Sequence, residues 1–177
     1  IAFVLRQVRL QRDERALLDL RTFAFRTFTL ASALMMVMMG LLLGVVTILP
    51  IYMQNVLDLD PLATGLLLLP GGLLMGLLSP FVGRLYDRVG PRVLLIVGTV
   101  ATSGSLWFAT TFDATTSATF VLVFHLVLSL GLAFSFTPLF SSGLGALPAR
   151  LYSHGSAIFS TTQQLAAAAG VALLVSV

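Results

Sequence analysis

The chain alternates between long apolar runs and short segments that carry charges or turn-forming residues. Residues 27–57, 61–83, 93–112 and 114–149 contain no Asp, Glu, Lys or Arg. A helix needs about 20 apolar residues to cross the hydrocarbon core of a bilayer, which is about 30 Å thick. We therefore expect complete spans at about 28–53, 61–83 and 93–112 and one within 114–149. A fifth apolar run begins near Ser156 and stops with the chain.

Composition supports the same class. The chain is 58% hydrophobic and 10% charged, and its mean hydropathy is +1.02. Such a chain has too few polar side chains to cover a water-exposed surface, so it belongs in a lipid bilayer. Because the segments between the spans are short, we predict an all-α integral membrane protein built as an up-and-down bundle. It would have four complete transmembrane helices and an incomplete fifth.

Arginines all fall on one side of this predicted bundle. Six of them lie between residues 6 and 26, three lie between the second and third spans, and Arg150 precedes the fifth run. The opposite connections contain Asp58, Asp60 and Asp113. Arginine-rich loops normally face the cytoplasm, which predicts a plasma-membrane protein with these loops inside the cell. The sequence pI of about 10.2 therefore reflects topology and does not indicate a nucleic-acid partner.

Catalytic and metal-binding groups are scarce. The chain has no cysteine and only two histidines, which lie far apart in sequence. Disulfides, thiolate metal sites and a nucleophile–base pair are therefore not expected. We predict neither an enzyme nor a bound cofactor.

The second and third spans are joined by residues 83–95, which read GRLYDRVGPRVLL. Gly83 would allow close approach where the two helices converge, and Gly90 permits the positive φ of a tight turn. Asp87 can pair with Arg88 or Arg92, and it can also face a nearby helix N-terminus. A signal for topology alone would explain arginines in any order, but it does not explain glycine and aspartate at these spacings.

This hinge resembles the loop signature of the major facilitator superfamily, G-x-L-x-D-R-x-G-R/P-R-x-x-L. The resemblance implies a latch that holds the cytoplasmic helix ends together in one state of an alternating-access cycle. The latch residues would be Gly83, Arg84, Asp87, Arg88, Gly90 and Arg92. Pro91 stands where the family usually has the first residue of a basic pair.

Segments 49–54, 65–72, 146–158 and 163–164 are similar to the fourteen-helix drug:proton antiporters of that superfamily. On this resemblance residues 1–5 end a preceding transmembrane helix and residues 6–26 form a cytoplasmic connection. Residues 27–177 would be an incomplete C-terminal six-helix half, whose partner is the missing N-terminal half. The implied function is proton-coupled efflux of small amphipathic drugs or toxic compounds. Alternatives are a dedicated exporter of one metabolite and a membrane interaction protein that does not transport.

Prolines and glycines interrupt two of the expected spans. The segment Pro70-Gly71-Gly72 is expected to break or loosen the second helix, and Pro138 to kink the fourth. Gly72 and Gly76 form a small-residue pair with Gly83 nearly in line, which favours a helix-packing surface. A broken helix that lines a cavity is the alternative.

Polar and soft side chains inside the spans are the candidate substrate contacts. The last run places a stripe of small and polar residues on one face, namely Ser156, Ser160, Gln163, Ala167 and Gly170, with Gln164 beside it. Amides need hydrogen-bond partners in hydrocarbon, so both are expected to point into protein, bonding another helix or contacting substrate.

Met35 and Met39 offer a pliable cavity wall, although Met36 and Met38 show that some methionines of this run must face elsewhere. His125 lies within the fourth span and is expected to bond a neighbouring helix or to act in transport. No Asp or Glu lies inside a span. The proton-coupling group is therefore expected in the missing half, or else at His125.

Overall fold

A computed structural model describes residues 18–176, and within them the only regular elements are helices. The long helices are α2 (Arg26–Asn55), α3 (Pro61–Ala109), α4 (Ala118–Gly145) and α5 (Tyr152–Val175). Two short 3-10 helices, η2 (Leu20–Ala24) and η3 (Ala149–Leu151), precede α2 and α5. Each long helix is long and apolar enough to cross a membrane.

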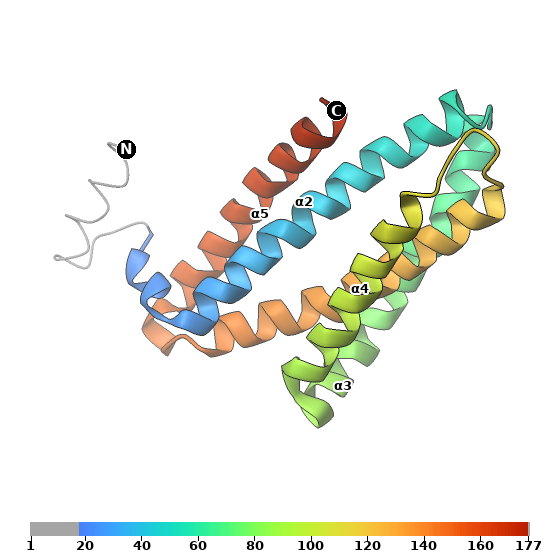
Figure 1. Ribbon diagram of the computed structural model, residues 1–177. Coiled ribbons are helices and arrows are strands. Elements are labelled where there is room, and N and C mark those ends of the chain that lie inside the picture. Colours follow the sequence, from blue (N-terminus) through green and yellow to red (C-terminus); the bar gives the residue numbers. More distant parts are fainter. Residues whose placement is uncertain (1–17, 177) are drawn as a thin grey trace.

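Helix α3 is two spans joined at Gly90. Its 49 residues would extend about 74 Å as one straight helix, more than twice the thickness of a bilayer core. Gly90 has φ +76° and ψ 174°, which turns the chain sharply, and Pro91 follows as the first residue after the turn. Figure 1 shows the first arm (61–89) and the second arm (91–109) meeting at the lower end of the molecule. The tight turn expected at this glycine is therefore present.

The expected spans agree with the helices to within a few residues. Helix α2 covers the first span, the two arms of α3 cover the second and third, and α4 covers the fourth. The fifth begins at Tyr152, four residues before the expected start at Ser156, and its 24 residues are enough to cross a bilayer core. The prediction of an all-α membrane bundle is confirmed.

The helices pack in two pairs. Helix α4 runs along α3, α5 runs along α2, and contacts between α2 and α4 join the pairs. In Figure 1 α2 and α5 lie side by side, and α4 crosses from α3 toward the start of α5. Large apolar side chains that face away from these contacts, such as Leu62 and Leu77, are exposed, as expected for a surface in lipid.

Glycines lie where the paired helices touch. A Cβ placed at Gly98 would lie 2.8 Å from the carbonyl oxygen of Gly131, and one at Gly131 would lie 2.7 Å from the backbone nitrogen of Thr102. A Cβ at Gly170 would lie 2.5 Å from the Cα of Gly40. Real Cβ atoms do not come this close to backbone atoms. The contact between α3 and α4 and the contact between α2 and α5 therefore each require a residue without a side chain.

The predicted break at Pro70-Gly71-Gly72 was wrong. The first arm of α3 stays helical through all three residues, because Gly90 is the residue of α3 with non-helical backbone angles. A proline removes one hydrogen bond from a transmembrane helix, and neighbouring groups can absorb that loss. Pro138 likewise lies inside α4, which continues to Gly145.

The predicted packing surface at Gly72 and Gly76 meets no other described helix, and the neighbouring Gly71 makes a close contact instead. A Cβ at Gly71 would collide with the ring of His125 on α4, whereas Gly72, Gly76 and Gly83 have no described atom within 4 Å of such a Cβ. Successive helix residues point about 100° apart, and α4 covers only the side on which Gly71 lies. Gly83 therefore does not mediate close approach of the two arms.

Two buried phenylalanines join α2 to α5 near the arginine-bearing end. The rings of Phe28 and Phe159 are 5.1 Å apart, and both side chains are fully buried. Just before α2, Asp19 is 4% exposed and accepts two hydrogen bonds from the Arg21 side-chain Nε. These hydrogen bonds hold the pKa of the Asp19 carboxyl below its ordinary value. This end of the bundle is thus held by packing and by a short charged turn.

The glycine contact between α3 and α4 gives a direct test. We expect Gly98→Ala to lower the melting temperature of the detergent-solubilised full-length protein by several degrees, because overpacking costs about 1–3 kcal/mol. Gly104→Ala is the matched control, since no described atom lies within 4 Å of its added Cβ. It should leave the melting temperature unchanged or slightly raised. Equal effects of the two substitutions would contradict the assigned contact.

Candidate functional site

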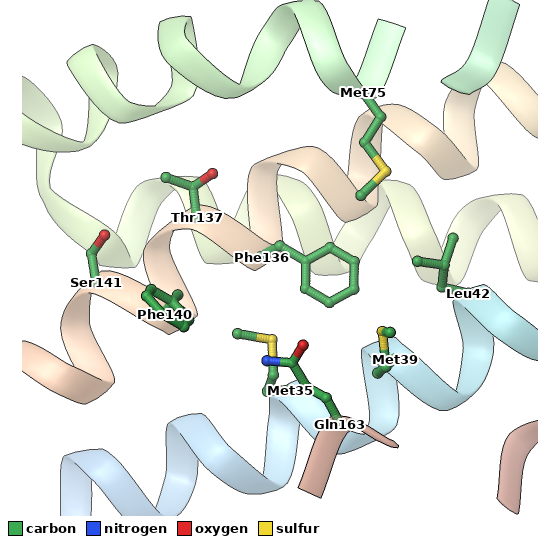
Figure 2. Close-up of a pocket in the computed structure, with 9 residues that line it drawn as sticks. All are labelled: Met35, Met39, Leu42, Met75, Phe136, Thr137, Phe140, Ser141 and Gln163. Atoms are coloured by element: carbon green, nitrogen blue, oxygen red, sulfur yellow. The ribbon is translucent and has the colours of Figure 1, made fainter. Parts of the chain in front are cut away.

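An open hollow of about 440 Å³ lies between the two helix pairs. Each long helix contributes to its wall, and the first arm of α3 does so through Met75. The lining residues are Met35, Met39, Leu42, Met75, Phe136, Thr137, Phe140, Ser141 and Gln163. Figure 2 shows these side chains around a common space.

The wall is apolar, with few hydrogen-bonding groups. Three methionines and two phenylalanines supply polarizable and aromatic surface, and none of the lining residues is charged. Gln163 on α5 offers an amide, and Thr137 and Ser141 on α4 offer hydroxyls. Methionine side chains adapt to irregular shapes, which suits ligands of varied structure. The hollow can therefore hold an amphipathic compound and bond its polar group at a few points.

The spacing of the methionines on α2 decides which of them reach the hollow. Met35 and Met39 are four residues apart and so share a face of the helix. Met36 points elsewhere: it is 38% exposed, compared with 2% for Met35. Met36 borders a separate, apolar groove between α2 and α5 on the outer surface. The predicted cavity residues Met35, Met39 and Gln163 do lie together.

The hollow is not lined by three other candidates, namely Ser160, Gln164 and His125. Ser160 is exposed and its hydroxyl donates to the Ser156 carbonyl one turn earlier, at 3.1 Å. Gln164 is exposed, because it points about 100° away from Gln163. Among residues 18–176, only Gln163 of the two amides borders the hollow.

His125 instead packs between helices. Its Nε2 lies 3.1 Å from the Leu68 carbonyl oxygen on the first arm of α3, and only 8% of the residue is exposed. A carbonyl only accepts, so Nε2 carries the donated proton and Nδ1 keeps a lone pair. Within the described part of the chain Nδ1 has no hydrogen-bond partner. The histidine thus bonds a neighbouring helix, which was one of the two expectations for it.

Sequence reasoning missed the contribution of α4 to the hollow. Phe136 and Phe140 form one pair at helical spacing and Thr137 and Ser141 a second, on either side of the same face. This spacing was the available signal. It was weak, because α4 is apolar around its whole circumference and no face stands out.

The hinge residues differ from the expected latch geometry. Asp87, Arg88 and Arg92 are exposed, and Asp87 forms no ion pair with any described arginine. Adjacent residues on a helix diverge, which separates Asp87 from Arg88. The turn at Gly90 then carries Arg92 onto the second arm. Among the described residues Asp87 therefore pairs with neither Arg88 nor Arg92, and the Arg84 guanidinium carbon lies 5.9 Å from the Phe81 ring centroid.

A family model described as the Major Facilitator Superfamily matches residues 3–171. The chain belongs to this superfamily. It is 41% identical over 99% of its length to the "Lincomycin resistance protein LmrB" of Listeria monocytogenes, and 41% identical over all of it to the "Uncharacterized MFS-type transporter YcnB" of Bacillus subtilis. A "Multidrug resistance protein B homolog" of Mycobacterium tuberculosis is 30% identical over 92% of the chain. No solved structure matches the chain significantly.

The chain spans about a third of the length of these curated relatives: 36% for the Listeria protein, 37% for YcnB and 31% for the Mycobacterium protein. It is a multi-pass membrane protein of a transporter family, as its helices and the family match agree. The family predicted from the hinge and the neighbouring segments is confirmed.

Proposed function

We propose that this chain is part of a secondary transporter that exports amphipathic drugs or toxic compounds by alternating access. The observation that carries the proposal is the hollow lined by methionine and phenylalanine, to which each long helix contributes. Drug efflux is also supported by the chain's membership of the major facilitator superfamily. Two relatives are named for lincomycin resistance and for multidrug resistance. A wall that adapts its shape and offers few hydrogen-bonding groups favours the binding of a broad range of compounds over the binding of one metabolite.

Proton coupling is the proposed energy source. Apart from Asp87 at the hinge, the described helices contain no Asp or Glu, and His125 is engaged in packing α4 against α3. A proton-coupled exporter needs a group that titrates along its pathway. We therefore place this group in the remainder of the full-length protein, which also supplies the other wall of the central pathway.

The proposed latch acts at the cytoplasmic end of the plasma-membrane protein. Arg84, Asp87, Arg88 and Arg92 are exposed around the turn at Gly90, as groups that pair with another part of the protein would be. Arg26 and Arg150 lie at this same end, because each precedes a helix that leads away from it. The arginine excess at this end supports a location inside the cell.

One labelling experiment tests both orientation and latch. A single cysteine replaces Val89, a hinge residue that is 43% exposed and lies outside the proposed latch set. An impermeant thiol reagent should label it in inside-out vesicles and not in intact cells, and substrate should change its labelling rate as the latch opens and closes. A cysteine replacing the exposed Ala114 is the control and should react in intact cells. Labelling of position 89 from outside contradicts the orientation, and a rate unaffected by any exported substrate contradicts the latch.

The two adjacent amides of α5 test the substrate hollow. We expect Gln163→Ala to change the relative resistance that the full-length transporter confers to different compounds. A lost neutral hydrogen bond is worth about 0.5–1.5 kcal/mol, which is roughly two- to tenfold in affinity. Compounds without a hydrogen-bonding group should be unaffected.

Gln164→Ala is the matched control, because it removes the same amide from the exposed side of α5. It should leave the order of resistances unchanged. Resistance measured across a panel of compounds, with membrane abundance determined in parallel, separates specificity from yield. An unchanged order for Gln163→Ala, or the same change for both variants, would contradict the hollow as substrate site. Loss of export of only one compound by Gln163→Ala would favour a dedicated exporter.

A further inference from the structure

A second hollow lies at the opposite end of the molecule from the hinge, where α3 passes to α4. Its volume is about 300 Å³, and its lining includes Phe108, Phe112, Asp113 and Phe120. It shares none of its lining residues with the hollow between the two helix pairs. Three aromatic rings and one acid therefore meet at a site that the proposed export pathway does not use.

The aromatic rings are held in place by their neighbours. The centroid of Phe108 is 5.7 Å from that of Phe112, with the rings nearly perpendicular, and 5.9 Å from that of Phe120. Phe112 also stacks on Tyr52 of α2 at 5.8 Å. The Tyr52 hydroxyl donates to the backbone carbonyl of Asp113 at 2.6 Å, so it fixes both the ring and the turn. The aromatic wall exists before any ligand arrives.

The carboxylate is fixed as well. One oxygen of Asp113, Oδ1, accepts hydrogen bonds from the backbone nitrogen and the hydroxyl of Thr115, each at 2.7 Å, and from the Thr116 hydroxyl at 3.3 Å. These donors, the Thr115 hydroxyl first, lower the pKa of the Asp113 carboxyl from its ordinary value. The group is therefore ionised at neutral pH, with its charge held at the hollow.

The surrounding charges also favour a cation. The described arginines lie at the other end of the bundle, and the nearby connection from α2 to α3 carries two more acids, Asp58 and Asp60. Asp60 caps α3 by accepting from the Ala63 backbone nitrogen at 2.8 Å. The carbonyl end of α3 and the amide end of α4 both border the hollow, and their opposite partial charges offset each other. The net field is set by the carboxylates.

We propose that this hollow binds organic cations, such as a quaternary ammonium or a protonated amine with apolar substituents. Aromatic faces attract such cations, and a carboxylate nearby adds a charge that a neutral ligand cannot use. A small metal ion would keep its water shell and gain little from the rings. The site would concentrate cationic compounds at the arginine-free end, and its existence does not depend on the proposed export function.

Ligand-observed NMR titration of the full-length protein in a maltoside detergent tests the site with choline as the probe. The control ligand is 3,3-dimethylbutan-1-ol, which has the same shape without the charge. Asp113→Asn should weaken choline binding about five- to tenfold, since a unit charge pair at about 4 Å in water is worth about 1 kcal/mol. The asparagine oxygen can still accept the hydrogen bonds that form the turn. Asp58→Asn, which removes the same charge from the same end but outside the hollow, should change the affinity less than twofold.

Phe120→Leu supplies a second test that leaves the turn intact, because this ring is 55% exposed. This substitution should weaken choline binding about two- to fivefold, whereas Phe120→Tyr, which keeps an aromatic ring, should bind choline as the wild-type protein does. The proposal is supported if Asp113→Asn and Phe120→Leu weaken choline binding while Asp58→Asn and Phe120→Tyr do not. Equal effects of Asp113→Asn and Asp58→Asn, equal binding of choline and its uncharged analogue, or no choline binding at all would overturn it.

Discussion

Backbone contact at glycine holds together the two helices of each pair. In a bilayer the lipid chains are as apolar as leucine, so helices associate through close packing rather than by escape from water. Gly98 and Gly131 let α3 and α4 touch, and Gly40 and Gly170 do the same for α2 and α5. Each contact leaves no room for a Cβ, which fixes where the helices cross.

The hollow follows from these crossings. Because small residues take up the contacts within each pair, the larger side chains of α2 and α4 face the space between the pairs. Met35 and Phe136 reach that space from opposite sides, and Gln163 enters from α5. A shift of one crossing by a single residue would turn these side chains away. The packing contacts and the chemistry of the wall therefore depend on each other.

Much of this arrangement is predictable from sequence, because it depends on local properties. Uncharged runs of sufficient length mark the spans, and Gly90 in a short charged hinge predicts the turn with positive φ that joins the two arms. The shared helical face of Met35 and Met39 places them together in the wall. These features need only the length, charge and period of a helix.

The remainder depends on which face a neighbouring helix covers, and an apolar helix does not reveal this. Gly71 and Gly72 are equivalent in sequence, yet only Gly71 lies against α4. Thr137 and Ser141 lie in a helix that is apolar all round, so nothing marks them as lining residues before the pairs are assembled. Asp87 shows the same dependence: it is close to Arg88 and Arg92 in sequence, but the helix and the turn at Gly90 direct these side chains apart.

Photolabelling of the full-length transporter shows directly whether the hollow between the helix pairs receives lipophilic substrate. An exported compound carrying a diazirine would be cross-linked in membranes and the labelled residues identified by mass spectrometry. We expect labels at Met35, Met39 and Met75 that an excess of the unlabelled compound removes. Met36 serves as the internal reference, because it lies on the same helix but faces the outer groove. Labelling at Met36 with none at Met35 or Met39 would contradict the account.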